Sequence, residues 1–302
     1  MRIVITGSEG LIGSALSKEL IKQGHKVIRT DIIRKVEPNY VMADITYYET
    51  LSRVFRDEPD VVFHLGAEVS RLTSEQCPSV AINKNINGVW NIIIWCLATG
   101  SKLILSGTSE SYGDIYDKGI VAKEDIPRAE CNNMYALTKL MGEDLIRYYN
   151  RQYGLKAVIA RIFMCYGQEE ANGYKSAITR FIDGALRNDV LEVHKGTGRA
   201  WCYIDDTVSG LIALMKDDGT KCETYNIGND EYILTEDLAR MIIELSDSKS
   251  KINLIDQPRQ MTPHKKADFT KMRERLGWSA KIPLKDGLEK SVIWHKQNLK
   301  LR

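Results

Sequence analysis

The sequence predicts an α/β fold in which a doubly wound parallel sheet is combined with a smaller, interleaved α/β domain. Short β-branched runs alternate with longer helical patterns through the first half of the 302 residues, a glycine-rich turn follows the first run, and a polar stretch begins at about residue 167. Such alternation is typical of βαβ units with helices on both faces of a parallel sheet. A chain of this length can bury the core that both domains need.

The elements of the first domain are expected in a regular order. Strands are expected at residues 2–6, 26–31, 40–44, 61–66, 102–107 and 156–167, and helices at 11–23, 47–56, 80–99 and 133–153. The polar, glycine-containing stretch 167–176 predicts an excursion from the sheet, and "RAWCYIDDTVSGLIALM" predicts a strand end and a helix that rejoin it. The first domain is therefore expected to comprise residues 1–166 and about 196–224, and the smaller one about 167–195 and 225–302.

Composition argues against several classes of function. Lys plus Arg number 42 and Asp plus Glu 40, so the formal charge of +2 gives no electrostatic argument for nucleic acid or an acidic membrane surface as a partner. The first residues lack a secretory signal pattern, and the most apolar stretch, "NIIIWCLATG", is far shorter than the roughly 18 residues of a membrane span. A cytoplasmic location is therefore expected. The six cysteines form no CxxC pair, so we expect neither a metal site nor disulfides.

The turn after the first strand carries a dinucleotide signal. "TGSEGLIGS" places Gly7, Gly10 and Gly13 between a strand and a helix, where glycine permits a tight turn and lets backbone N–H groups approach a pyrophosphate. Asp31, at the end of the second strand, can accept hydrogen bonds from both ribose hydroxyls and would repel a 2′-phosphate, which favours NAD over NADP. Asp44, after the next strand, is either a solvated turn acid or an adenine contact.

A tyrosine and a lysine supply a candidate base. Tyr135 and Lys139 are four residues apart on an expected helix and therefore share a face. The ammonium charge favours the tyrosinate, which can remove a hydroxyl proton while hydride passes to a nicotinamide. Thr108 lies at the carboxyl end of the preceding strand, where open α/β sheets bind ligands, and could hydrogen-bond the same hydroxyl.

Together these motifs resemble the extended short-chain dehydrogenase/reductases, specifically the NAD-dependent nucleotide-sugar epimerases and dehydratases. The resemblance rests on TGxxGxxG, Asp31, Asp44, "HLGA", Asn85, the Thr108 loop, Tyr135 with Lys139, "GTGRAWCYIDD" and the C-terminal "DFTKMRERLGWSAKIPLKDGLEK". It implies a Rossmann-type NAD domain, a nucleoside-diphosphate sugar bound between the two domains, and a homodimer packed through helices 80–99 and 133–153.

The resemblance also implies roles for individual residues. NAD would be held by Gly7, Gly10, Leu11, Ile12, Gly13, Asp31, Asp44, Ile45, Leu65, Ala67 and Lys139. The substrate would be bound by Glu68, Thr108 and Arg199. Catalysis would rest on Thr108, Glu110, Tyr135 and Lys139.

The stretch "SGTSESYG", residues 106–113, bears on the choice between reactions that share a 4-keto sugar intermediate. For a 4,6-dehydratase, the resemblance implies that Glu110 removes the C5 proton and, with Ser109 at the middle position, also protonates the departing C6 hydroxyl. UDP-glucuronate decarboxylases resemble the same "TSE" and rely on an arginine in a stretch similar to that around Arg199. We expect a lyase of the 4,6-dehydratase type, with UDP-glucuronate decarboxylase and nucleotide-sugar 4-epimerase as alternatives. A non-catalytic NAD-binding sensor is the alternative from a different class.

Two positions depart from the family pattern. Met164 stands where the family usually has an asparagine that contacts the sugar diphosphate, and Gln168 stands where it usually has proline. The loss of the asparagine donor leaves room for an unusual substrate. His64 ends an apolar strand and is expected to be a satisfied buried imidazole, and Cys165 and Cys202 are expected to be core thiols.

Overall fold

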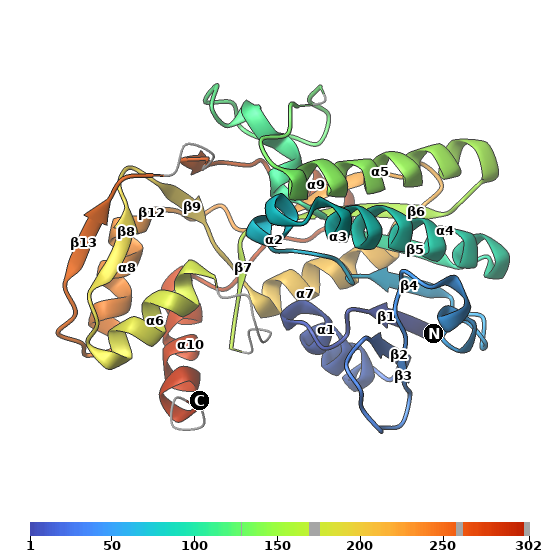
Figure 1. Cartoon of the computed structure of the whole chain (residues 1–302), viewed down its shortest axis with the longest axis horizontal. Helices are drawn as coiled ribbons and strands as arrows, with labels where there is room; N and C mark the ends of the chain where they lie inside the picture. The colour runs from blue at the N-terminus through green and yellow to red at the C-terminus, as the bar shows by residue number, and fades with distance from the viewer. Residues whose placement is uncertain (128, 169–175, 258–261, 299–302) are drawn as a thin grey trace.

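A seven-stranded sheet forms the centre of the molecule, and every strand pair in it is parallel (Figure 1). The computed structural model describes residues 1–127, 129–168, 176–257 and 262–298. The strand order is β3-β2-β1-β4-β5-β6-β11, which confirms the predicted doubly wound sheet. The strands are β1 (Arg2–Thr6), β2 (Lys26–Asp31), β3 (Tyr40–Met42), β4 (Val61–His64), β5 (Lys102–Thr108), β6 (Ala157–Ile162) and β11 (Thr224–Ile227).

Helices cover both faces of this sheet because successive strand residues point in opposite directions. Ile3 and Ile5 of β1 belong to the core cluster that includes residues of α1 (Leu11–Lys22) and α7 (Ile204–Ala213). Val4 belongs to the cluster on the other face, with residues of α4 (Gly88–Thr99) and α5 (Met134–Tyr153). Figure 1 shows α4 and α5 on one side of the sheet and α1 and α7 on the other.

The smaller region lies beside the large sheet and contains three short sheets (Figure 1). These are β12-β9-β14, β13-β8 and β10-β7. Helices α6, α8 and α10 pack against one another there, whereas α9 returns to β11 of the large sheet. The elements are β7 (Cys165–Tyr166), α6 (Ala177–Arg187), β8 (Leu191–His194), β9 (Gly198–Ala200), β10 (Cys202–Tyr203), β12 (Tyr232–Leu234), α8 (Thr235–Leu245), β13 (Ile252–Ile255), β14 (His264–Lys265), α9 (Thr270–Leu276) and α10 (Leu284–Asn298).

The strands change sheet at positions that differ from the expected domain boundaries. β11 pairs with β6, so the large sheet continues to Ile227 rather than stopping at about residue 224. β9, expected in the first domain, pairs instead with β12 and β14 in a small sheet. The sheet to which β9 and β11 belong is decided by pairing with strands that are distant in sequence. The local sequence pattern does not predict such pairing. The excursion expected at 167–176 lies largely outside the described residues.

Two expected helices have a different local form. The helix expected at 47–56 is the 3₁₀ helix η1 (Tyr48–Arg53). The helix expected at 80–99 starts as α3 (Pro78–Ile82), passes through the π-helical turn η2 (Asn83–Asn87) and continues as α4. Such turns often mark functional sites. The remaining short elements are α2 (Arg71–Gln76), η3 (Ser109–Ile115) and η4 (Leu214–Lys216).

The strand expected at 156–167 is broken at Met164. This residue has a φ of 35°, in the left-handed region, between the end of β6 and the start of β7. That conformation costs most L-residues roughly 1–2 kcal/mol, whereas asparagine adopts it more readily. The asparagine usual in the family therefore has a backbone reason to occupy this position, and Met164 keeps the turn at an energetic cost.

Candidate active site

The glycine-rich turn closes one end of a cavity of about 400 Å³. Gly7 has a φ of 68°, and a Cβ on it would lie 2.7 Å from the backbone N of Gly66. A Cβ on Gly13 would lie 2.1 Å from the carbonyl oxygen of Gly7, so neither position has room for a side chain. The predicted cofactor residues that line this cavity are Gly7, Gly10, Asp31, Asp44, Ile45, Leu65 and Ala67.

Two acids in this cavity are already fixed by backbone donors. The Asp31 carboxylate accepts from the backbone N–H of Glu9 at 3.1 Å and from that of Ile32 at 2.8 Å. Asp44 accepts from the backbone N–H and the hydroxyl of Thr46 at 2.9 and 2.8 Å. Asp31 is thus held at the end of β2, where it can accept from ribose hydroxyls, and Asp44 serves as a turn acid that also lines the cavity.

The cavity suits a dinucleotide, although four of the predicted cofactor residues, Leu11, Ile12, Gly13 and Lys139, lie outside its lining. Leu11 and Ile12 are partly buried and pack against the core from α1, and Gly13 is buried inside the turn. The helix N-terminus, the absence of side chains at the turn and the fixed Asp31 are the features that bind a pyrophosphate and a ribose.

Tyr135 and Lys139 lie on α5, as predicted. The helix is capped by Asn133, whose side-chain oxygen accepts from the backbone N–H of Ala136 at 2.8 Å. Tyr135 is half-buried, and Lys139 is 5% exposed with its Nζ 3.5 Å from the Ser106 hydroxyl. Burial lowers the pKa of Lys139 to about 8 against the opposing charge of Glu143.

His64 is buried at the end of β4. Its Nδ1 lies 2.7 Å from the Thr6 hydroxyl, whereas Nε2 has no hydrogen-bond partner among the described residues. Burial, together with the charge of Lys139, lowers the pKa of His64 to about 3. The imidazole is therefore neutral, and it is less fully satisfied than the sequence predicts.

The predicted catalytic loop starts at the carboxyl end of β5. Thr108 is 6% exposed, and its hydroxyl accepts from the backbone N–H of Glu110 at 3.2 Å. The chain then enters η3, where Gly113 has a φ of 46°. The Tyr116 hydroxyl donates to the carbonyl oxygen of Ser109 at 3.0 Å. These bonds fix Glu110 close to the strand end.

Glu110 does not stand alone in this loop, because it forms an ion pair with Lys265 of β14. The two side chains are 14% and 4% exposed, and Asn133 Nδ2 donates to the other carboxylate oxygen at 3.3 Å. Burial favours the neutral carboxyl, but the charges of Lys265 and Arg71 and the two hydrogen bonds prevail, and the pKa of Glu110 falls to about 2. Glu110 is thus held as a carboxylate.

Arg199 lies next to this ion pair. β14 pairs with β9 in a register that sets Lys265 opposite Arg199. The guanidinium donates to the carbonyl oxygens of Gly198 at 2.8 Å, Pro263 at 2.6 Å and Thr262. Burial lowers its pKa, and the charge of Glu110 opposes this. Three cations, Arg71, Arg199 and Lys265, thus interact with the single carboxylate of Glu110.

Glu68, the remaining predicted substrate residue, contacts a residue that lines the candidate cofactor cavity. Its carboxylate accepts from Lys84 Nζ at 3.0 Å, and Lys84 lines the cavity that contains Gly7. Its backbone N–H and carbonyl oxygen bond the side chain of Asn85 at 2.8 and 3.1 Å. Asn85 also donates to Thr138 at 3.0 Å, which ties the π-helical turn to α5.

Sequence reasoning missed Lys265 and Asn133. Lys265 lies 155 residues from Glu110, in a stretch without a recognisable motif. Asn133 directly precedes an amphipathic helix, and an asparagine at that position predicts a helix N-cap.

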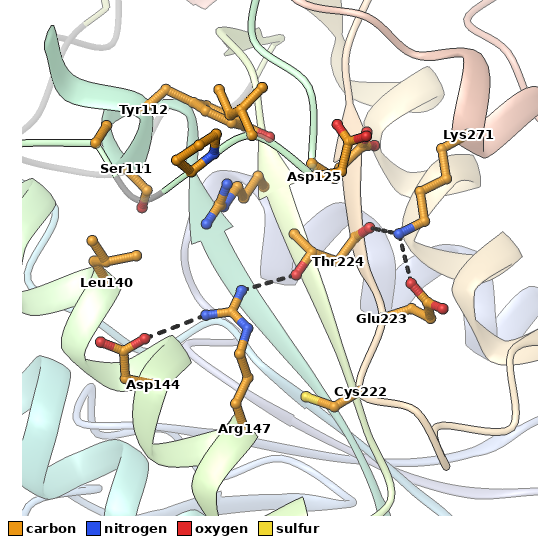
Figure 2. A pocket seen from close by; sticks show the side chains of 15 residues that line it. Ser111, Tyr112, Asp125, Leu140, Asp144, Arg147, Cys222, Glu223, Thr224 and Lys271 are labelled. Carbon is orange, nitrogen blue, oxygen red and sulfur yellow. Dashed lines mark hydrogen bonds and ion pairs between the residues drawn. The ribbon is translucent and has the colours of Figure 1, made fainter. Parts of the chain in front are cut away.

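A second cavity of about 390 Å³ lies behind the catalytic loop (Figure 2). Figure 2 shows Arg147 between Asp144 and Thr224. The Arg147 guanidinium lies 3.5 Å from the Asp144 carboxylate and donates to the Thr224 hydroxyl at 3.0 Å. Lys271 Nζ forms an ion pair with the Glu223 carboxylate at 2.6 Å. Two cations that line this cavity, Arg147 and Lys271, therefore pair with acids that also line it.

Below this cavity, a buried ion pair supports the catalytic loop. Glu143 is fully buried and accepts from Arg161 at 2.8 and 3.1 Å. The Arg161 guanidinium lies 4.5 Å from the centre of the Tyr112 ring. Tyr112 follows Glu110 in η3 (Ser109–Ile115), so these contacts stabilise the position of that loop.

Two kinds of feature are absent from the residues that the structure describes. No group of three or more His, Cys, Asp or Glu side chains in them is arranged to hold a metal ion. None of the described helices combines the length and the apolar character that crossing a membrane requires.

Comparison with known proteins gives a consistent result. The model of the NAD dependent epimerase/dehydratase family matches residues 3–228. UDP-glucuronic acid decarboxylase 5 of Arabidopsis thaliana is 32% identical over 95% of this chain and 87% of its own length. UDP-N-acetyl-alpha-D-glucosaminuronate decarboxylase of Bacillus cytotoxicus is 31% identical over 98% of each chain. The UDP-glucuronic acid 4-epimerase of Bacillus cereus, solved with UDP-glucuronic acid and NAD, is 27% identical with a TM-score of 0.89 over 98% of this chain and 99% of that one.

Proposed function

The chain belongs to the NAD-dependent epimerase/dehydratase family, and from this membership we propose that it decarboxylates a nucleoside-diphosphate uronic acid through a 4-keto intermediate. NAD is its cofactor, and nucleotide sugars are the class of molecule it modifies. The proposal departs from the expected 4,6-dehydratase. The observation that carries it is the ion pair between Glu110 and Lys265.

Glu110 is poorly suited to the proton transfers of a dehydratase. That reaction requires the residue to gain a proton and then give it to the departing C6 hydroxyl. Because Lys265, Arg71 and Asn133 hold its pKa at about 2, Glu110 is almost entirely ionised at pH 7. This low pKa makes the carboxylate, which is held by Lys265 and by Asn133, a weak base toward the C5 proton.

The charge around Glu110 favours an acidic sugar. Arg71, Arg199 and Lys265 bring three positive charges to one negative charge in a partly buried place. Buried cations are stable only when anions neutralise them. A diphosphate and a sugar carboxylate supply such anions, whereas the C6 hydroxyl of a neutral hexose does not.

The remaining residues fit the oxidation that precedes loss of carbon dioxide. Bound NAD supplies a hydride acceptor for C4. Tyr135 takes the C4 hydroxyl proton, with Lys139 favouring the tyrosinate and Thr108 orienting the hydroxyl. The product is a 4-keto sugar with a carboxylate on C5, which is a β-keto acid and loses carbon dioxide readily. Two relatives at least 31% identical are named as decarboxylases of UDP-uronic acids, which supports the same reaction.

A panel of substrates tests the proposal. The purified protein is incubated separately with UDP-glucuronate, UDP-N-acetylglucosaminuronate, UDP-glucose, GDP-mannose and dTDP-glucose. The masses of the products are then measured by mass spectrometry. We expect loss of carbon dioxide from a uronate and no net NADH. Loss of water from a neutral hexose would restore the dehydratase. A uronate converted without change in mass would favour 4-epimerisation, the reaction named for the Bacillus cereus structure.

We also propose that the protein is a homodimer packed through α4 and α5. On α5, Leu137, Met141 and Tyr148 lie on one face and are 38%, 40% and 47% exposed. On α4, Trp90 is 45% exposed. Changing Leu137 to Glu should convert a dimer to a monomer in sedimentation velocity. The matched control is Ile293→Glu on α10, which is 56% exposed and lies on another helix. A wild type that sediments as a monomer would exclude this arrangement.

A further inference from the structure

The lining of the cofactor cavity carries more negative than positive charge. Among the described residues that line it, Glu9, Asp31 and Asp44 are acids, and Lys84 is the one cation. Lys84 already forms an ion pair with Glu68 at 3.0 Å. The pyrophosphate of NAD is an anion, and the 2′-phosphate of NADP adds about two more negative charges at neutral pH. The charges beside the ribose therefore bear on the choice between the two cofactors.

Glu9 contributes a carboxylate at the glycine-rich turn itself. It stands between Gly7 and Gly10, at a position that TGxxGxxG leaves open, and its side chain is 11% exposed. Its backbone N–H donates to the Asp31 carboxylate at 3.1 Å. Burial raises the pKa of the Tyr40 hydroxyl to about 12, and the charges of Asp31 and Glu9 both add to this rise. The two carboxylates therefore act on the same region, next to the ribose that Asp31 is expected to bind.

Lys35 neutralises Glu9 from the loop between β2 and β3. Its ammonium group forms an ion pair with the Glu9 carboxylate and lies 3.9 Å from the carboxylate of Glu37. The hydrogen bond to Glu9 raises the pKa of Lys35 more than burial lowers it, so the ammonium stays charged. The Tyr40 hydroxyl donates to the carbonyl oxygen of Ile33, which lines the cavity two residues before Lys35. The loop thus holds a cation close to the ribose side of the cavity, and Glu9 occupies that cation.

We propose that Glu9 selects NAD over NADP by keeping the Lys35 ammonium in an ion pair. A 2′-phosphate needs a cation beside the ribose to bind it. While Glu9 is ionised, its pair with Lys35 has no net charge, and Asp31 repels the phosphate. Asp31 thus rejects a 2′-phosphate directly, and Glu9 rejects it by withholding the counterion. Cofactor choice precedes the reaction on the sugar, so this role of Glu9 does not rest on the decarboxylation proposed above.

The test measures which cofactor the protein retains. Wild type and variants are equilibrated with equal concentrations of NAD and NADP until the bound composition is constant, and unbound nucleotide is removed by rapid gel filtration. The protein is then denatured, and the released nucleotides are quantified by chromatography. Wild type should carry NAD with little NADP. Glu9→Gln keeps the shape of the side chain but leaves the Lys35 charge uncompensated, so the ratio of bound NADP to bound NAD should rise on the order of tenfold.

Lys35→Met shows whether the gain comes from the ammonium. In that background, Glu9→Gln removes the same carboxylate where no Lys35 charge is left to bind a 2′-phosphate, so the ratio should rise much less. Arg34, the neighbouring exposed cation, is present in every variant and cannot account for that difference. Glu19→Gln is the matched control, because Glu19 pairs with Lys22 of α1 at 3.7 Å and lies outside the lining of the cofactor cavity. Its ratio should equal that of wild type.

Each outcome supports or contradicts this role of Glu9. If Glu9→Gln retains NADP no better than wild type does, Glu9 does not select the cofactor. If Glu9→Gln raises the ratio equally with and without Lys35, the carboxylate acts through its own charge alone, and the withheld ammonium is excluded. A variant that retains no nucleotide is titrated separately with NAD and with NADP by calorimetry, and the ratio of the two Kd values then decides in the same way.

Discussion

The ion pair between Glu110 and Lys265 predicts how stability changes with pH. The pKa of Glu110 falls from 4.5 to about 2 on folding, a difference worth about 3 kcal/mol at pH 7. Because the folded pKa is the lower one, this stabilisation is complete above the unfolded pKa and is lost as pH falls through the folded pKa. About 1 kcal/mol of this stabilisation is left at pH 3, so about 2 kcal/mol is lost between pH 6 and pH 3.

Glu110→Gln removes this titration and isolates it. Urea unfolding of wild type and variant at pH 6, 5, 4 and 3 gives the difference in their free energies of unfolding. We expect that difference to shrink by about 2 kcal/mol as pH falls. Glu124→Gln is the control of opposite sign, because burial raises the pKa of Glu124. As pH falls, the free energy of unfolding of wild type should rise relative to that of the Glu124→Gln variant. A difference between wild type and the Glu110→Gln variant that stays constant within about 0.5 kcal/mol would refute the depressed pKa.

Three further predictions concern the cofactor side and the oxidation step. Tyr135→Phe should lower the rate of nicotinamide reduction by on the order of 10²–10⁴-fold, measured in a single turnover by absorbance, while the Kd for the nucleotide sugar changes little. Gly13→Ala places a Cβ 2.1 Å from the carbonyl oxygen of Gly7, so NAD binding in calorimetry should be lost or the protein should lose thermal stability. Asp31→Ala removes the acceptor for the ribose and the charge that repels a 2′-phosphate, so the ratio of the Kd for NADP to that for NAD should fall at least about tenfold.

The parts of this molecule that depend on local pattern could be predicted from the sequence. The turn around Gly7 follows a strand and opens a helix, so its role needs no tertiary information. Tyr135 and Lys139 share a face because they are one helical turn apart. The parallel, doubly wound character of the large sheet follows from the alternation of strands and helices.

The partner of Glu110 could not be predicted in this way. Lys265 and Lys266 are adjacent and chemically identical in the sequence, yet one is buried and the other exposed. A strand of two residues carries no periodic signal, and only its pairing with β9 turns Lys265 toward Arg199. The expectation that Glu110 acts as an acid and base treated it as an isolated loop carboxylate, and a contact across 155 residues changed that chemistry.

One side chain connects the helix that carries Tyr135 to the loop that carries Glu110. The oxygen of the Asn133 amide caps α5 on the Ala136 N–H at 2.8 Å, and its nitrogen donates to Glu110 at 3.3 Å. The cap fixes the first turn of the helix that carries Tyr135, the base proposed for oxidation at C4. The second bond fixes the carboxylate that pairs with Lys265. A single amide therefore positions the proposed base on α5 and the Glu110 carboxylate relative to each other, which neither the helix nor the loop alone could ensure.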